Sequence, residues 1–517
     1  MTTPRPISKI DLTLTFGDPY QSGQPDPDVP CRILIMGDFS GRGTKQDRAE
    51  QQSPAHWRPV RIDRDNVQTM PGTLNVRLHN PLLGESAPPV TLKFAELDDF
   101  HPDRLIHQIE PLNKLSDLRR RLANPTTFPQ AADEIRAWAE PRQSTEAQSV
   151  PPESLPQQAS GGSLLDQMLE QAPTSVPNLR PTEWQSFLQS IVGPYAVPKE
   201  HPLAQELCTQ VDAAISQIMR AVLHHPAFQT LEAAWRGLSF IVDRLETDSQ
   251  LQLYVLDLPK KELAADLLND HDLQSTELYR LLAHETVRTP GAHPWAVVGG
   301  IYTFDHTSED VAMLEKIASL CKEAGAPFLA AASPNIVGCR SFGTMPDPDD
   351  WETAVTQGKD QERWDRLRHL PEAAYLGLVL PRFLLRLPYG QATEPISSFT
   401  FEEMVSVPDH EDYCWGNPMF ACLTLLGQAF AKSGWQMNPG SIKDIDGLPL
   451  HVYQDDSGES VTKPCAEVLF SETTVESLLE RGLMPLISFK DHDQIRLARC
   501  QSLAVPLQAL AGRWGER

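Results

Sequence analysis

The chain has 517 residues, of which 40% are apolar, and a formal net charge of -24 at pH 7. The length predicts more than one domain, at the usual ~100–200 residues each, and the apolar content is sufficient for sizeable cores. The excess of acidic residues argues against nucleic acid as a partner, because its phosphates would be repelled.

Targeting signals are not apparent. The N-terminal stretch MTTPRPISKIDLTLTF lacks the apolar core of a secretory leader. The longest apolar run, YLGLVLPRFLLRL, is interrupted by Pro381, Arg382 and Arg386 and is too short and too charged to cross a bilayer. The eight cysteines follow no regular spacing, which is typical of reduced thiols. We expect a cytoplasmic protein without direct membrane insertion.

The first part of the chain is predicted to be β-rich and then helical. Three stretches alternate apolar and polar residues, as half-buried strands do: Ile10, Leu12, Leu14 and Phe16; Leu74, Val76 and Leu78; Val90, Leu92 and Phe94. The period then becomes helical in a stripe formed by Leu105, Ile106, Ile109, Leu112, Leu115, Leu118 and Leu122. Pro102 suits a first helical turn, and Pro111 marks a break.

Between the first two of these strands, residues 32–46 read RILIMGDFSGRGTKQ, an apolar run followed by a glycine-rich turn. A phosphate-binding loop needs a lysine directly after its last glycine, but Thr44 separates Gly43 from Lys45. The polar stretch that follows also lacks the apolar period of a helix. We expect a strand and a structural loop. Nucleotide binding, with Asp257 as a metal ligand, remains a minor alternative.

A change of composition separates two parts of the chain. Residues 124–163 are rich in Pro, Gln and Ser and cannot bury enough apolar surface to fold alone, although DEIRAWAE within them is compatible with a short helix. We predict a small domain at 1–123, a linker at 124–163 that joins two separately folded parts, and a large domain at 164–517.

The second part is predicted to be α/β. It opens with a short amphipathic patch of Leu164, Leu165, Met168 and Leu169. Two long helices are expected around residues 203–222 and 228–245, interrupted by HHPAF. Strand-like runs then alternate with helical stretches: LQLYVLDL, WAVVGGIY, PFLAAAS, LPLHVYQ, AEVLFSE and LMPLISF. The fold class is therefore mixed α/β: α+β in the first part, and in the second a central sheet flanked by helices.

Candidate reactive residues do not assemble into a catalytic set. His224 and His225 are adjacent and are interpreted as a helix end, where imidazole suits the C-terminal dipole. Ser341 in GCRSFG is one position too late for a nucleophile elbow. Other candidates have structural interpretations: Asp98 and Asp99 as a helix start, PDPDD near Asp350 as a solvated loop, and Tyr413 and Trp415 as core or interface anchors. We expect no enzyme, no cofactor and no metal.

Several stretches resemble the contractile sheath of type VI secretion. ILIMGDFSGRG, RPVRIDRDNV and TLKFAELDDFHPDRLIHQIEPLNKLSDLRRRL are similar to its small subunit. HHPAFQTLEAAWRGL, YLGLVLPRFLLRLPYG, YCWGNPMFACLTLLGQAFAKSGW and TKPCAEVLFSE are similar to its large subunit. The resemblance covers nearly the whole chain outside the linker and implies a fusion of the two subunits.

The resemblance implies a structural role. Sheath units stack head to tail around an inner tube on a baseplate, contract to drive injection, and are dismantled by an AAA+ unfoldase. It implies strand exchange with a neighbour through Ile10, Leu12, Leu14 and Phe16, and unfoldase docking at Leu164, Leu165, Met168 and Leu169. An equally simple interpretation of the second set is a linker helix that packs on its own domain.

The match to the large subunit stops short of that subunit's C-terminal strands. We therefore expect the contact between neighbouring sheath units to lack part of its hydrogen-bonding partners. The chain then polymerises with reduced linkage, co-assembles with a full-length large subunit, or acts at a tube end or the baseplate. The alternatives are therefore a sheath-fold accessory, cap or baseplate protein and, from another class, an α/β nucleotide-binding protein or enzyme.

Overall fold

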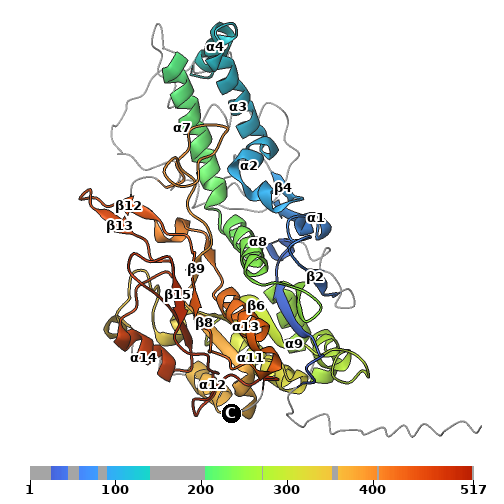
Figure 1. Cartoon of the computed structure of the whole chain (residues 1–517). Helices are drawn as coiled ribbons and strands as arrows, with labels where there is room; N and C mark the ends of the chain where they lie inside the picture. Colours follow the sequence, from blue (N-terminus) through green and yellow to red (C-terminus); the bar gives the residue numbers. More distant parts are fainter. Residues whose placement is uncertain are drawn as a thin grey trace, which may run out of the picture.

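The computed structural model describes residues 25–44, 57–79, 90–139, 204–269, 272–351, 359–404 and 407–514. Its centre is a nine-stranded sheet in the order β11-β15-β14-β8-β7-β6-β1-β5-β2 (Figure 1). In chain order these strands are β1 (Cys31–Gly37), β2 (Val60–Ile62), β5 (Leu251–Asp257), β6 (Val297–Phe304), β7 (Phe328–Ala332), β8 (Leu376–Leu380), β11 (Asp444–Ile445), β14 (Met484–Ser488) and β15 (Ile495–Leu497).

The middle of the sheet is parallel and its edges are antiparallel. The run from β14 through β8, β7, β6 and β1 to β5 is parallel throughout, whereas β2 and β15 pair antiparallel to their inner neighbours. The chain visits β1, β5, β6, β7 and β8 in that order, and their spatial order is β5-β1-β6-β7-β8. This is the 2-1-3-4-5 order of a doubly wound α/β sheet. The predicted mixed α/β class is confirmed.

Strand β1 comes from the N-terminal part but lies inside the sheet. It pairs with β5 along its whole length, from Cys31 opposite Leu251 to Gly37 opposite Asp257, and with β6 on its other side. Every residue of β1 except Arg32 is buried. The expectation that the two parts fold separately is therefore wrong, because neither part contains all the strands of this sheet. The boundaries 1–123, 124–163 and 164–517 stay a prediction.

Helices cover both faces of the sheet. One face packs against α8 (Pro226–Arg244) and α13 (Met419–Ser433), together with side chains such as Ile33 and Ile35 of β1. The other packs against α9 (Lys260–Asn269), α11 (Ser308–Ala324) and α12 (Lys359–Arg368), with Leu34 and Met36. The alternating residues of β1 thus reach two different cores.

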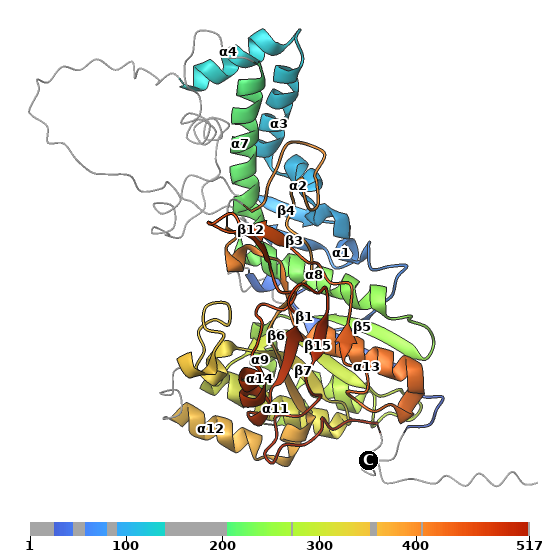
Figure 2. The same cartoon turned by 60° about the vertical axis from the view of Figure 1, so that its left-hand side comes forward.

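A helical arm projects from the sheet region in both views (Figures 1 and 2). It comprises α2 (Pro102–Gln108), α3 (Glu110–Ala123), α4 (Phe128–Ala139) and α7 (Ala204–Leu223), and α1 (Met70–Thr73) and the ribbon of β3 (Val76–His79) and β4 (Thr91–Phe94) lie at its base. Helices α3 and α7 lie side by side and bury the predicted stripe, including Leu115 and Leu118, against Val211 and Ile215. The break at Pro111 and the short helix at DEIRAWAE are confirmed.

The remaining strands form small ribbons. β9 (Phe383–Leu384) pairs with β10 (Trp415–Gly416), and β12 (Val452–Gln454) forms a hairpin with β13 (Ser460–Thr462). The predicted strand at AEVLFSE is wrong. Of its residues, Ala466 makes one bridge to Phe383, and the rest lead as a loop into α14 (Glu472–Glu480). Glu467 N–H also donates to the Arg382 carbonyl at 3.1 Å, and its side chain forms an ion pair with the same arginine.

Short helical turns connect these elements. They are α10 (Glu277–Tyr279), the π-helical turn η6 (Arg280–His284), and the 3-10 turns η1 (Arg42–Thr44), η4 (Leu97–Phe100), η5 (Leu273–Ser275), η7 (Pro334–Val337), η8 (Pro348–Asp350), η10 (Pro371–Tyr375), η11 (His410–Asp412) and η12 (Gly434–Gln436). Among the helices of the described ranges, none is long and apolar enough to cross a membrane.

Candidate functional site

The glycine-rich loop after β1 is held by carboxylates. Asp257, at the end of β5, accepts hydrogen bonds from the backbone N–H groups of Phe39 and Ser40, at 2.9 and 3.0 Å. Arg42 forms an ion pair with the same carboxylate, donates to the Asp257 carbonyl at 2.7 Å, and pairs with Glu262 at 2.9 Å. The guanidinium therefore lies over the carboxyl ends of β1 and β5.

This arrangement opposes phosphate binding. In a doubly wound sheet, ligands bind outside the carboxyl ends of the strands, and phosphates need free N–H groups there. Here Gly43 N–H donates to the Asp38 carboxylate at 2.9 Å, and Asp257 accepts the N–H groups of Phe39 and Ser40. Burial raises the pKa of Asp38. Asp257 is an ion-pair partner of Arg42, and these contacts support the predicted structural role of the loop.

A buried charge network lies where α8 meets the segment after β9. The guanidinium of Arg386, with 4% of its side chain exposed, lies between Glu232 and Glu403, both with 0% exposed. It donates to Glu232 at 2.8 Å and to Glu403 at 2.7 Å. Arg236 pairs with Glu232 at 2.7 Å and donates to the Tyr389 hydroxyl at 2.8 Å. We call these five residues the Arg386 network.

The charges of the network set the ionisation of its carboxyls. Burial raises the pKa of Glu403, but the Arg386 charge and its hydrogen bonds outweigh burial and lower that pKa to about 2. The pKa of Glu232 is lowered by Arg386 and Arg236 in the same way. Both carboxylates stay ionised inside the protein at neutral pH, where each arginine charge is matched by a glutamate.

Acid should weaken this network. A carboxyl whose folded pKa is depressed contributes stability above its unfolded pKa, and loses it as pH falls through the folded value. For Glu403 this contribution to the free energy of unfolding is roughly 3 kcal/mol. It is lost between about pH 4.5 and about pH 2. We expect the free energy of unfolding to fall across this window, and to fall less steeply for Glu403→Gln. Urea unfolding at several pH values measures both slopes, and equal slopes would contradict the assignment.

The two adjacent histidines lie at the junction of α7 and α8. His225 is the N-cap residue of α8, and its Nδ1 accepts a hydrogen bond from the N–H of Ala227 at 3.2 Å. Burial lowers the pKa of His225, which suits an acceptor. His224 faces Asp412 at 3.2 Å and Glu403 at 3.7 Å. The helix end is confirmed, since His224 directly follows α7 and His225 caps α8, and the contact of an imidazole with the C-terminal dipole stays a prediction.

A second charge cluster holds the base of the β12–β13 hairpin. Arg382 donates to Glu467 at 2.7 Å and to Glu411 at 3.1 Å. The His410 ring joins Glu467 at 3.2 Å to Lys463 at 2.9 Å. Burial lowers the pKa of Lys463. We call these five residues the hairpin-base cluster.

Aromatic residues connect the cluster to the core. Trp415 donates its indole N–H to the His410 carbonyl at 2.7 Å, and the hydroxyl of Tyr413 contacts His451 at 2.8 Å. The Lys463 ammonium lies 5.1 Å from the centre of the Tyr413 ring. Tyr413 and Trp415 are both buried, which confirms their interpretation as anchors.

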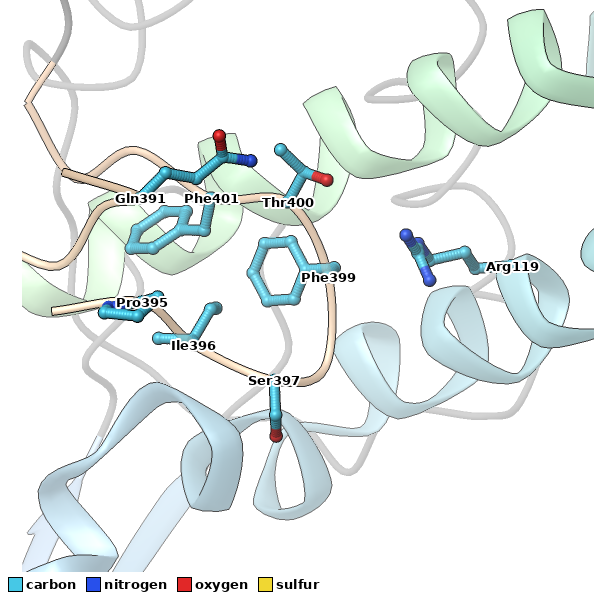
Figure 3. Close-up of a pocket in the computed structure, with 8 residues that line it drawn as sticks. All are labelled: Arg119, Gln391, Pro395, Ile396, Ser397, Phe399, Thr400 and Phe401. Carbon is cyan, nitrogen blue, oxygen red and sulfur yellow. The ribbon is translucent and has the colours of Figure 1, made fainter.

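Contacts between the N-terminal and C-terminal parts continue along the arm. Arg119 of α3 forms an ion pair with Asp212 of α7. Asp103 accepts from the backbone N–H groups of Ser397 and Ser398, at 3.0 and 2.9 Å. Figure 3 shows residues 391–401 between α3 and α7, with the Arg119 side chain of α3 directed toward them. They line a cavity of about 220 Å³ with polar and aromatic residues mixed.

The other candidate residues have structural roles where they are described. Asp99 accepts from the N–H groups of Ala95 and Glu96 at 2.7 and 3.0 Å, which confirms a helix start. Asp347 caps the turn of PDPDD by accepting from Asp349 at 3.1 Å. In the described ranges, no three His, Cys, Asp or Glu side chains form a group that fits a metal ion.

The residues predicted for assembly lie outside the described residues. These are Ile10, Leu12, Leu14 and Phe16 near the N-terminus, and Leu164, Leu165, Met168 and Leu169 before α7. The Arg386 network was not among the predicted sites. The available signal was an arginine inside the apolar run YLGLVLPRFLLRL, because a buried guanidinium requires carboxylate partners.

Two family models match the chain. Residues 205–504 match the family described as EvpB/VC_A0108, tail sheath N-terminal domain. Residues 9–137 match the family described as type VI secretion system, VipA, VC_A0107 or Hcp2. The two matches fall on the parts that the sequence assigned to the large and the small subunit.

Two proteins of Pseudomonas aeruginosa are similar to the chain. The type VI secretion system sheath protein TssC1 is 32% identical over 309 residues, which are 59% of this chain and 62% of TssC1. The type VI secretion system sheath protein TssB1 is 28% identical over 104 residues, which are 19% of this chain and 58% of TssB1. The chain thus spans less than two thirds of the length of either relative.

Proposed function

The chain belongs to the type VI secretion tail sheath family, and from this premise we propose that it is a structural subunit of a contractile sheath rather than an enzyme. Regions similar to both sheath subunits occur in one chain. The observation that carries the proposal is the position of β1. A strand of the small-subunit-like part completes the sheet of the large-subunit-like part, as a single building block requires.

We propose that these building blocks stack head to tail around an inner tube protein and on baseplate components. A head-to-tail contact joins two different surfaces and does not close, so it generates a helical polymer. The strand at Ile10, Leu12, Leu14 and Phe16 is our candidate donor to a neighbour, since an added strand satisfies backbone groups at a sheet edge. The extended polymer is kinetically trapped, and contraction releases its interface energy.

Electron microscopy tests the sheath role. The purified chain, alone and together with the other sheath and tube proteins of the same organism, is expected to form striated tubes. Single particles or rings without tubes would instead favour the alternative of an accessory, cap or baseplate protein. Tubes that appear only when a separate large subunit is added would favour co-assembly.

Nucleotide binding is the alternative from another class, and the loop after β1 argues against it. Arg42 occupies the carboxyl ends of β1 and β5, and Asp38 and Asp257 take N–H groups that a phosphate needs. A calorimetric titration with ATP and Mg²⁺ should therefore show no binding in the micromolar range. Tight, magnesium-dependent binding would overturn the structural assignment of the loop.

We propose that an AAA+ unfoldase grips the amphipathic patch before α7. Changing Leu164, Leu165, Met168 and Leu169 together to Ser removes its apolar surface, and should weaken unfoldase binding at least tenfold in a pull-down or anisotropy assay. The matched control changes Gln167, Glu170, Gln171 and Ser163 to Ala, and should bind normally. Normal binding by the Ser variant would contradict docking at this patch and favour a helix that packs on its own domain.

A further inference from the structure

A groove of about 500 Å³ runs along one side of α7. It lies where α7 meets the loop at residues 400–402, and the α7 side chains that line it are Thr209, Asp212, Ala213, Ser216, Gln217 and Arg220. Side chains three, four and seven residues apart share one face of a helix, so the groove follows the helix axis. The face of α7 that packs on α3 carries other residues, among them Val211 and Ile215.

The floor of the groove is formed by small side chains whose hydroxyl groups are already bonded. The Ser216 hydroxyl donates to the Asp212 carbonyl at 2.6 Å, and the Thr209 hydroxyl donates to the Gln205 carbonyl at 2.9 Å. Ala213, between them, is exposed. Hydroxyls that bond to their own helix leave their carbon atoms to contact a neighbour. Apolar side chains can therefore cover this surface without breaking a hydrogen bond.

The charged side chains at the groove are also paired. Asp212 forms an ion pair with Arg119 of α3, and the Arg220 guanidinium donates to the Glu402 carbonyl at 2.9 Å. The Glu402 carboxylate accepts from the N–H of Gln391 at 3.0 Å. Groups that have partners within the fold lose little when a neighbour displaces water from them. The groove is thus suited to an amphipathic helix of low charge.

The sequence before α7 contains a segment of this kind. Residues 182–192 read TEWQSFLQSIV and fall outside the described part of the chain. Their apolar side chains recur with the helical period: Trp184, Phe187, Leu188, Ile191 and Val192. Thr182 and, three residues later, Gln185 fit a capping box, and Gly193 and Pro194 are typical of a helix end. The sequence therefore predicts an amphipathic helix at 183–192.

The length of the groove and of the connecting chain fit this helix. A helix at 183–192 is about 15 Å long, and α7 extends about 17 Å from Thr209 to Arg220, at ~1.5 Å per residue. Residues 193–203 lead from its end to Ala204, the first residue of α7. They span at most about 40 Å when extended, which is enough to return to the Thr209 end. This short return favours an antiparallel helix pair.

The other amphipathic segment of the connection fits the groove less well. Residues 163–170, SLLDQMLE, carry two acidic side chains, which would approach the carboxylates of Asp212 and Glu402. Like charges brought together at an interface oppose binding. Residues 183–192 have the larger apolar stripe and a single charge, at Glu183. Charge therefore favours the segment nearer to α7.

We propose that residues 183–192 form a helix that docks antiparallel in the groove of α7 of the same chain. The arm then contains a third long-axis helix beside α3 and α7. Leu188 lies opposite Ala213 at the centre of the groove, and Glu183 lies near Arg220 at its far end. Docking removes the apolar stripe of the segment from water. The proposal is independent of the proposed sheath role, because it concerns a contact within one chain.

Hydrogen exchange of the full chain tests the docking. Amides of residues 183–192 should exchange at least tenfold more slowly than in a free peptide of the same sequence. Ala213→Arg places a long charged side chain in the groove and should abolish this protection, since arginine is a good helix former and leaves α7 itself intact. Ala221→Arg, at an exposed position of α7 outside the groove, is the matched control and should keep it. Exchange at the peptide rate in the unchanged chain, or protection that persists in a folded Ala213→Arg variant, would overturn the proposal.

Cross-linking tests the contact directly and decides the matter if Ala213→Arg does not fold. Leu188→Cys combined with Ala213→Cys should form a disulfide within one chain on mild oxidation, identified by mass spectrometry of the linked peptides. Leu188→Cys combined with Ala221→Cys is the control and should not. A denaturing gel without reductant separates the outcomes. A linked species of two chains would overturn docking within the chain in favour of a second copy, and the absence of any link would overturn the assignment of the groove.

Discussion

Replacing Arg386 by methionine should lower the free energy of unfolding at pH 7 by about 3–5 kcal/mol. The change keeps the length of the side chain but removes its charge, and leaves Glu232 and Glu403, both fully buried, with less compensation. Urea unfolding followed by circular dichroism measures the loss. Glu232→Gln and Glu403→Gln, added to Arg386→Met, should recover part of it, since they remove the uncompensated charges.

Arg120→Met is the matched control. Arg120 pairs with Asp117, but 82% of its side chain is exposed, so its loss should cost less than about 0.5 kcal/mol. The difference between the two arginines separates a buried network from a surface ion pair. An Arg386→Met variant within about 1 kcal/mol of the unchanged protein would show that the network does not hold α8 to the segment after β9.

Replacing Ile35 by aspartate should cost more than about 4 kcal/mol and should loosen the sheet of the C-terminal part. Ile35 is fully buried in β1, between Val255 of β5 and Gly299 of β6. A carboxylate there is buried without a partner. Hydrogen exchange in β6, β7 and β8 provides the readout, because these strands lie far from residue 35 in the sequence but follow β1 in the sheet, with β6 directly beside it.

Two further variants serve as controls for Ile35→Asp. Lys93→Asp changes an exposed position of β4 and should leave exchange in β6 to β8 unchanged. Ile35→Val removes one methylene group and should cost about 0.5–1.5 kcal/mol. If Ile35→Asp leaves β6 to β8 protected and affects the N-terminal part alone, the two parts are independent and the shared sheet is wrong.

Local features of the fold were predictable from the sequence because they depend on nearby residues. The stripe from Leu105 to Leu122 and the apolar face of α7 follow the helical period, and Pro111 lies at the start of α3, where its missing N–H costs no helical bond. The run LQLYVLDL gives β5, and WAVVGGIY gives β6. In each case, propensity and periodicity agree with the tertiary environment.

Long-range pairing could not be predicted in this way. No local pattern indicates that β1 pairs with β5, which is more than 200 residues later, or that Arg386 meets Glu232, 154 residues away in the chain. AEVLFSE has the apolar character of a strand, but its backbone pairing is limited to a bridge from Ala466 to Phe383 and a bond from Glu467 N–H to the Arg382 carbonyl. These contacts are made to a segment about 85 residues earlier, which a single stretch of sequence does not contain.

Cleavage of the connecting segment tests the central claim most directly, that the two subunit-like parts form one folded unit. A protease site placed within residues 140–203 allows the chain to be cut after it has folded, and size-exclusion chromatography with mass detection follows the products. We expect both fragments to elute together in a one-to-one complex at the mass of the uncut chain, about 57.6 kDa for the monomer. Two folded fragments that elute separately would contradict the account.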